Sequence, residues 1–323
     1  DRHGTRWKIS AIPLGGYVKF FGDENAASVP DQATVETMTA EERQHSFFYQ
    51  PLRSRAAIVV AGPVANFILA IVIFAFVFSV YGRQITSARV DAVVPESAAA
   101  AAGLQAGDVV LAIDGSRIDS FSDMQRVVSA NAGRTLSLEI NRGGVPMTLT
   151  ATPQLKRGKD GFGNSTCQAV LGVSRSMSAA DIRTETVNPM TAVWLGTKET
   201  WSIIDRTFSF IGGLFAGTEC ADQVGGVVKI AQISGQVASL GFMPVLQLAA
   251  MLSVSIGLLN LFPIPLLDGG HLLFYGIEAV LGRPLPERAQ EIGFRIGFVI
   301  VVMLMIFTFI NDTSPWWSRL LAS

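Results

Sequence analysis

Residues 260–270 of the chain read Asn-Leu-Phe-Pro-Ile-Pro-Leu-Leu-Asp-Gly-Gly. They end a long apolar run, and residues 240–267 of that run contain no Lys, Arg, Asp or Glu. A carboxylate at membrane depth is costly unless something compensates its charge. Asp268 therefore needs a basic residue, a proton, a metal ion or water as its partner.

The residues around Asp268 indicate which partner fits. Pro263 and Pro265 interrupt the helix, and interrupted backbone is tolerated at membrane depth where it is buried in protein or lines a cavity. Asn260 adds a second polar group at the same end of the run. This combination predicts a metal or catalytic site. The alternative is that Asp268 caps the N-terminus of a helix that runs from His271 onward.

Three stretches are long and apolar enough to span a bilayer, which requires about 20 residues. They are residues 56–82, 240–268 and 292–310. The chain is 49% hydrophobic and only 16% charged, whereas a soluble domain carries roughly 25% charged residues. These features predict an α-helical polytopic membrane protein. The net charge of −1 argues against a nucleic-acid partner.

Basic residues near the spans predict their orientation, because cytoplasmic flanks carry the excess of Lys and Arg. The excess lies before the first span and from the second span to the start of the third, at Arg53, Arg55, Arg283, Arg288 and Arg295. Residues 24–55 should then be a cytoplasmic loop, and residues 83–239 should lie outside the cytoplasm. Cys167 and Cys220 both fall in that outer region, where either a disulfide or two free thiols are compatible with the sequence.

Residues 87–155 have the pattern of a compact α/β module. A turn of sequence Gly-Leu-Gln-Ala-Gly-Asp at 103–108 precedes a strand at 109–113, and Asp114-Gly115 then signals a hairpin. A short helix at 97–102, a helix at 121–131 and closing strands at 136–140 and 147–151 complete the pattern. This order resembles a PDZ domain of the bacterial protease type, which implies binding of an extended peptide as an added strand. A role as a spacer or size filter is the alternative.

The remaining segments have weaker patterns. Residues 1–23 alternate apolar and polar side chains around Leu14-Gly15-Gly16, which predicts a β-region with a turn at the glycines. Residues 156–239 should be an extracytoplasmic linker with amphipathic helices. One of these helices is expected over 192–217, ending at Gly212-Gly213, and the other over 227–239.

Taken together, these segments resemble one family. The spacing Asn260-x-x-Pro-x-Pro-x-x-Asp-Gly-Gly270 resembles the second active-site motif of the site-2 proteases, which are intramembrane zinc metalloproteases. Residues 12–19 are similar to the membrane-reentrant β-region of that family, and residues 55–66 to the start of its second transmembrane helix. The module occupies the position of the PDZ domain in bacterial RseP-type members, although the best-known members carry two in tandem.

This resemblance implies a fold and a set of roles. The fold is an α-helical polytopic membrane protein with a reentrant β-region and an inserted mixed α/β PDZ domain. Asp268 takes the role of the aspartate ligand to Zn²⁺. Asn260 and the edge at Gly15 and Gly16 are implied to bind the substrate strand.

In the family, a His-Glu-x-x-His helix supplies the other two zinc ligands and the general base. This sequence has only three histidines, His3, His45 and His271, and none is four residues from another. We therefore expect the missing helix in an upstream segment of a longer protein. The chain as given should supply one zinc ligand, contain no catalytic residue, and be inactive alone.

The resemblance also implies a function. It predicts cleavage of single-span membrane proteins, such as anti-sigma factors or signal-peptide remnants, in the bacterial inner membrane, with the PDZ domain in the periplasm. A noncatalytic membrane adaptor whose PDZ domain binds peptide ligands is the alternative, and an upstream His-Glu-x-x-His would decide between the two. A transporter with broken helices predicts paired short spans in two matching halves, which the sequence does not show.

Overall fold

The computed structural model describes residues 46–159, 165–175, 182–217 and 224–321, together with Thr39 and Arg43. The chain divides into two compact units, the first formed by residues 1–62 and 261–298 and the second by residues 63–260 and 299–323. The predicted β-region of residues 1–23, with Gly15 and Gly16, lies outside the described residues, as does Cys220. The reentrant region and the possible disulfide therefore remain predictions.

Three helices of the described part are long and apolar enough to cross a membrane. They are α3 (Leu52–Tyr81), α8 (Phe242–Asn260) and the Arg288–Ser314 stretch of α10 (Glu287–Leu321). The second is shorter than the predicted 240–268 span, because the helix ends at Asn260. Pro263 cannot donate a helical hydrogen bond and disfavours helical backbone at the residue before it, so the chain leaves the helix there.

Small residues bring the helices of the second unit close together. Gly196 of α6 (Pro189–Ala216) lies against α3, and a Cβ at this position would be 2.8 Å from the carbonyl oxygen of Ile71. The Ser253 hydroxyl of α8 donates a hydrogen bond to the Asn66 carbonyl of α3 at 2.9 Å. Such small and hydroxyl-bearing contacts are typical of helix packing in membranes. The apolar core between the three helices consists of Ala70, Phe74, Ile203, Ala250 and Val254.

Helix α6 covers residues 192–216 of the predicted range 192–217, but it does not end at Gly212-Gly213. It continues through Gly212 and Gly213 to Ala216, and Gly217 with φ 71° forms its C-cap. Glycine within a helix costs roughly 1 kcal/mol relative to alanine but does not end it. The left-handed backbone that ends the helix is found instead at Gly217, where glycine adopts it without steric cost.

Helix α7 (Val227–Ala238) is capped by a side chain from a distant part of the chain. Its N-cap residue is Gly226, which has no side chain that could accept a hydrogen bond from the first turn. The Asp312 carboxylate of α10 accepts hydrogen bonds from the backbone N–H groups of Gly226 and Lys229, at 3.0 Å each. A carboxylate at a helix N-terminus satisfies exposed donors and complements the helix dipole. Asp312 thereby fixes α7 to α10.

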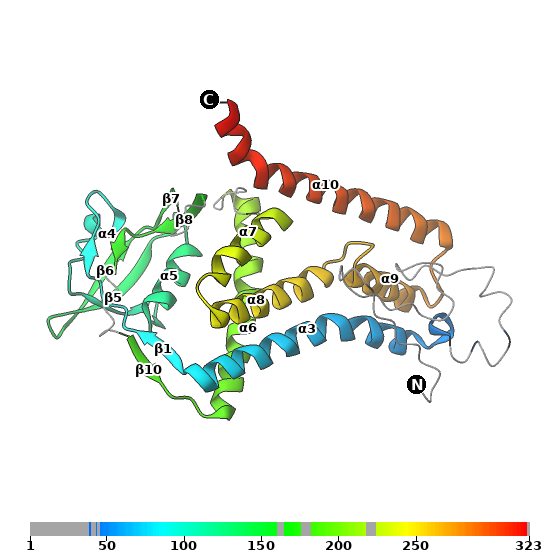
Figure 1. The fold of residues 1–323 in the computed structure, drawn as a ribbon, viewed down its shortest axis with the longest axis horizontal. Helices are drawn as coiled ribbons and strands as arrows, with labels where there is room; N and C mark the ends of the chain where they lie inside the picture. Colours follow the sequence, from blue (N-terminus) through cyan, green and yellow to red (C-terminus); the bar gives the residue numbers. More distant parts are fainter. Residues whose placement is uncertain are drawn as a thin grey trace. The chain divides into compact units, whose positions relative to one another are not determined.

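The module downstream of α3 has the elements that its sequence predicts (Figure 1). Its antiparallel sheet has the order β4-β3-β5-β6, formed by Ser116–Arg117, Val109–Ile113, Leu136–Arg142 and Val145–Ala151. Helices α4 (Ala98–Ala101) and α5 (Phe121–Ser129) pack against it. Asp114 and Gly115 form the hairpin turn with φ values of 48° and 75°. Positive φ at both positions is the conformation that favours Asp-Gly in a two-residue hairpin.

The core of this module extends beyond the predicted boundary at residue 155. Leu171 is buried in it, and β9 (Val173–Ser174) pairs with β2 (Ala92–Val93). Two further pairs follow: β7 (Gln154–Lys159) pairs with the next strand, β8 (Ser165–Val170), and β1 (Arg83–Thr86) pairs with the distant β10 (Ile182–Glu185). Part of the segment that the sequence predicts as a linker is therefore integral to the module.

Candidate functional site

Asp268 is the first residue of α9 (Asp268–Leu281), and Leu267 is the N-cap. No side-chain hydrogen bond caps this helix, so the capping alternative for Asp268 is not realised. The residue is half-buried. In the part of the chain that the structure describes, its carboxylate makes no hydrogen bond or ion pair, and its electrostatic neighbour is His271. The carboxylate lies near α3, since a Cβ at Gly62 would be 3.4 Å from its Oδ2.

The break between α8 and α9 ends in a tight turn. The Leu267 N–H donates to the Ile264 carbonyl at 3.0 Å, which places Pro265 and Leu266 at the two central positions. Leu266 has a φ of 112°. Turns with proline at the first central position often need positive φ at the second, where glycine is the usual residue. A leucine there costs on the order of 1–3 kcal/mol, and such strain clusters at functional sites.

The Asp-Gly-Gly sequence lets this turn lie directly against α9. A Cβ at Gly269 would overlap the carbonyl oxygens of Leu261 and Phe262, and a Cβ at Gly270 would overlap the carbonyl oxygen of Ile264. These obstacles are backbone atoms, which cannot rotate away as a side chain would. Both glycines are buried. They are required because the interrupted backbone packs on the first turn of the helix that begins with Asp268.

A buried ion pair braces α9 against the start of α3. The Arg55 Nη2 donates to the Glu278 Oε1 at 2.6 Å, with side chains only 16% and 18% exposed. The same guanidinium lies 5.0 Å from the ring centroid of Tyr275, within the range of a cation–π interaction. The helix that carries Asp268 is thus fixed to the first turn of α3.

The fit of these residues to a zinc ion is partial. A half-buried carboxylate without a hydrogen-bonding partner among the described residues is a suitable zinc ligand. No group of three or more His, Cys, Asp or Glu that could hold a metal occurs within the described ranges. His3 and His45 lie outside those ranges, and Asn260, half-buried at the end of α8, belongs to the other unit. The structure therefore places Asp268 alone.

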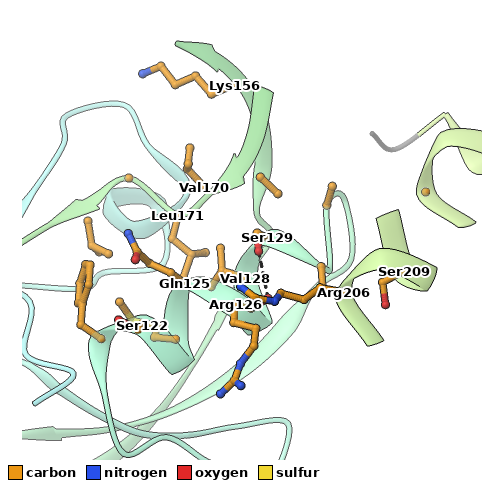
Figure 2. A pocket seen from close by; sticks show the side chains of 18 of the residues that line it. Ser122, Gln125, Arg126, Val128, Ser129, Lys156, Val170, Leu171, Arg206 and Ser209 are labelled. Carbon is orange, nitrogen blue, oxygen red and sulfur yellow. Dashed lines mark hydrogen bonds between the residues drawn. The ribbon is translucent and has the colours of Figure 1, made fainter. Parts of the chain in front are cut away.

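A second candidate site is a cavity of about 730 Å³ in the second unit. Figure 2 shows that it is lined from α5, from the strand around Val170 and Leu171, and from α6. Its apolar lining includes Phe121, Val128 and Phe210, and its basic lining consists of Arg126, Lys156 and Arg206, with no Asp or Glu among the described lining residues. Its volume is in the range of ligand-binding pockets. Sequence reasoning missed it, because no local pattern indicates that α6 contributes to a site on the module.

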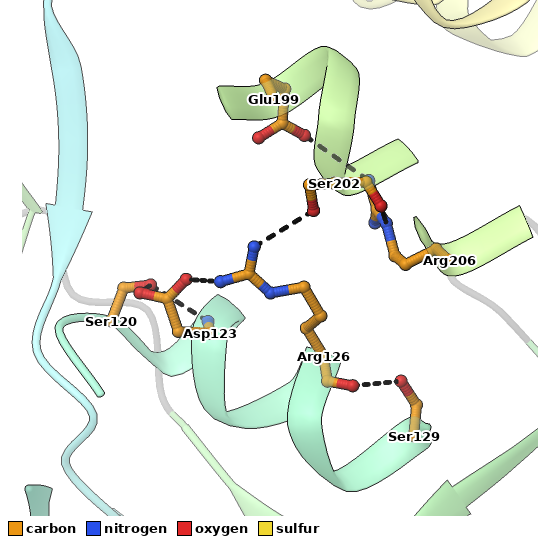
Figure 3. A network of polar contacts seen from close by, with 7 residues as sticks. All are labelled: Ser120, Asp123, Arg126, Ser129, Glu199, Ser202 and Arg206. Atoms are coloured by element: carbon orange, nitrogen blue, oxygen red, sulfur yellow. Dashed lines mark hydrogen bonds and ion pairs between the residues drawn. The ribbon is translucent and has the colours of Figure 1, made fainter. Parts of the chain in front are cut away.

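A hydrogen bond attaches α6 to the module beside this cavity, next to an ion pair within each of the two helices (Figure 3). Arg126 of α5 forms an ion pair with Asp123 and donates to the Ser202 hydroxyl of α6 at 3.1 Å. On α6 itself, Arg206 pairs with Glu199 at 3.4 Å. Two of the three basic residues that line the cavity are therefore held in place by neighbouring carboxylates.

Known proteins resemble this chain over nearly its whole length. A protein of Rhizobium meliloti named as a zinc metalloprotease is 50% identical over 312 residues, which cover 97% of this chain and 83% of the relative. The regulator of sigma-E protease RseP of Escherichia coli is 30% identical over 97% of this chain and 88% of its own. A solved PDZ domain of an SdrC-like protein from Listeria monocytogenes matches weakly, with a TM-score of 0.22 and 20% identity. The match covers 28% of this chain and 90% of the PDZ domain.

The family model described as Peptidase family M50 matches residues 1–304. That range includes the Asp268 motif, α3 and α8, and about half of α10. The family match and these relatives, together with the three apolar helices, show that the chain is a membrane protein of the peptidase M50 family, the site-2 proteases.

Proposed function

We propose that this chain is part of an intramembrane zinc endopeptidase that cleaves the transmembrane segments of single-span membrane proteins. The observation that carries the proposal is the Asp268 carboxylate, which follows a strained break at the end of an apolar helix and makes no hydrogen bond to the described residues. Family membership and the zinc metalloprotease name of a close relative support it. Anti-sigma factors and signal-peptide remnants are the substrate classes that we propose.

In this proposal Asp268 is one ligand of the zinc ion. When bound, zinc lowers the pKa of its water toward about 7 and polarises the scissile carbonyl. The other two ligands and the general base would come from a His-Glu-x-x-His segment, which these residues do not contain. The full-length protein must supply that segment for the enzyme to act.

The substrate must reach the site in an extended form. A helical peptide bond is poorly accessible, since its carbonyl is engaged in the i to i−4 hydrogen-bond ladder. We propose that the edge at Gly15 and Gly16 pairs with the unwound substrate and that the Asn260 side chain hydrogen-bonds to it. Both the edge and the Asn260 side chain would bind and orient the substrate strand, and neither would take part in bond cleavage.

We propose that the protein lies in the bacterial inner membrane, in the orientation that the arginines around the spans indicate. The cytoplasmic side would hold the loop 24–55 and the connection between α9 and α10. The module and helices α6 and α7 would then lie in the periplasm. This orientation follows the positive-inside rule.

Zinc content provides the direct test of the enzyme proposal. The full-length protein, purified in detergent, should contain about one zinc ion per chain by elemental analysis, as expected for a single catalytic site with an open position. Removal of zinc by a chelator should abolish cleavage of a single-span reporter, and added zinc should restore it. Full cleavage by protein shown to be free of zinc would refute the proposal.

The cavity between α5 and α6 favours a second function, binding of an extended peptide by the module. Gln125 is exposed on α5 and lines the cavity, so Gln125→Trp should fill it without disturbing the core. We expect at least about tenfold weaker binding of a fluorescein-labelled peptide pool to the full-length protein, measured by anisotropy, which corresponds to about 1.4 kcal/mol.

The matched control for that variant is Glu139→Trp. Glu139 is exposed on β5 and does not line the cavity. The Glu139→Trp variant should bind the peptide pool like the wild type, and both variants should keep the wild-type zinc content. Equal binding by the wild type and Gln125→Trp would exclude the cavity as the peptide site, while the enzyme proposal would stand.

A further inference from the structure

We propose that Gly297 of α10 is a positioning residue for Asp268, because it holds the interrupted segment 261–267 in the conformation that presents the carboxylate. The inference rests on the proposed zinc role of Asp268. It assigns a function in metal binding to the third membrane helix, which carries no ligand itself.

The contact of Gly297 is with backbone. The residue is buried in the first unit, and a Cβ at this position would overlap the carbonyl oxygen of Pro265 and lie 3.1 Å from the Pro265 Cα. No change of rotamer can relieve such an overlap. Any side chain at 297 therefore has to displace either α10 or the turn that contains Pro265.

The turn is held by glycines of two helices. Gly269 and Gly270 contact the carbonyls of the segment from α9, and Gly297 contacts Pro265 from α10. Leu266, at the centre of the turn, has the positive φ that leucine avoids. A strained residue persists only where its surroundings over-determine its conformation. We infer that the close backbone packing at these three glycines keeps Leu266 in its strained conformation.

The strain is coupled to the ligand through a short length of chain. Pro265 precedes Asp268 by three residues, and the hydrogen bond that closes the turn belongs to Leu267, the N-cap of the helix that Asp268 begins. A shift of Pro265 must therefore move the start of α9. Metal sites require ligand distances within about 0.2 Å of their ideal values, so a small shift is enough to weaken zinc binding.

Other glycines of α9 and α10 provide matched controls. Gly276 of α9 has nothing within 4 Å of the position that a Cβ would occupy, so Gly276→Ala adds the same methyl group in open space. Gly293 of α10 faces the Phe274 ring, with 2.7 Å between a Cβ and the ring Cζ. That obstacle is the end of a side chain, which can move. Gly297 differs from both because its neighbour is backbone of the active-site motif.

The test compares Gly297→Ala, Gly293→Ala and Gly276→Ala in the full-length protein, purified without metal. Zinc affinity is measured by competition with a chromogenic chelator, and the ligand field is read from the absorption spectrum of added Co²⁺. We expect Gly297→Ala to bind zinc at least about tenfold more weakly and to change the Co²⁺ spectrum. A loss of this size is typical when a residue that orients a metal ligand is replaced. The other two variants should keep the wild-type affinity and spectrum.

Wild-type affinity and spectrum in Gly297→Ala would overturn the inference, as would an equal loss in Gly293→Ala. If Gly297→Ala does not accumulate, the double variant Gly297→Ala with Leu266→Gly replaces it, since glycine lets the turn shift at little cost. Wild-type zinc affinity in that double variant would also overturn the inference. If the wild type itself binds no zinc, the proposed function fails together with this inference. If the wild type binds zinc and Gly297→Ala binds it equally well, only this inference fails.

Discussion

Asp268→Asn is expected to leave the protein folded and to lower both zinc affinity and reporter cleavage by at least about 100-fold, the upper end of the cost of losing an outer-shell partner. Asparagine has the shape of aspartate, but it is neutral and is not among the usual ligands of zinc. The Asp268 carboxylate makes no hydrogen bond to the described residues. The substitution therefore removes a charge without breaking a structural contact in that part of the chain.

The measurements for this variant are zinc per chain by elemental analysis and initial rates of reporter cleavage. Asp119→Asn is the control, because Asp119 is 50% exposed and pairs with Arg117 on the surface of the module. It should match the wild type in both measurements. Undiminished cleavage by Asp268→Asn would refute the ligand assignment, whatever the family of the chain.

The membrane helices and the module's main elements could be predicted from the sequence because their signals are local. A long uncharged stretch such as α3 is determined by the length that a bilayer requires. The Asp114-Gly115 turn is determined by the backbone angles that a two-residue hairpin imposes. Asp268 was also recognisable, since an isolated carboxylate at the end of an apolar run requires an explanation.

The features that were not predicted depend on contacts between distant segments. The pairing of β9 with β2 and the burial of Leu171 extend the module beyond residue 155. A strand of two residues in a polar segment has no periodicity to detect. The close approach of Gly297 to the Pro265 backbone likewise depends on where α10 packs, which the sequence of α10 does not indicate.

Asp108 is the residue whose loss should destabilise the module most. Its side chain is 1% exposed, and its two oxygens accept hydrogen bonds from the Arg142 Nε and Nη2, at 2.8 Å each. It also accepts from the Gln105 N–H at 2.9 Å, while Arg142 donates to the Gly103 carbonyl at 2.7 Å. One carboxylate thus joins the Gly-Leu-Gln-Ala-Gly-Asp turn to the end of β5.

Asp108→Asn should lower the free energy of unfolding by about 3 kcal/mol, the lower end of the cost of breaking a buried ion pair. The lower end applies because Arg142 is 28% exposed and keeps part of its hydration. The control Asp119→Asn removes an exposed pair and should cost less than about 1 kcal/mol. Protection of the β3 and β5 amides against hydrogen exchange in the full-length protein measures both effects.

The pH dependence provides an independent check. Hydrogen bonds from Arg142, and then that from Gln105, lower the pKa of Asp108 below its ordinary value of 3.8, against the opposing effect of burial. A carboxylate whose pKa is lower in the folded state contributes its full stability above the unfolded pKa and loses it as the pH falls through the folded pKa. The difference between wild type and Asp108→Asn should thus be constant near neutral pH and shrink below about pH 4, where the unfolded state binds a proton at this carboxylate before the folded state does. A difference that stays constant through this acidic range would show that the ion pair is not its source.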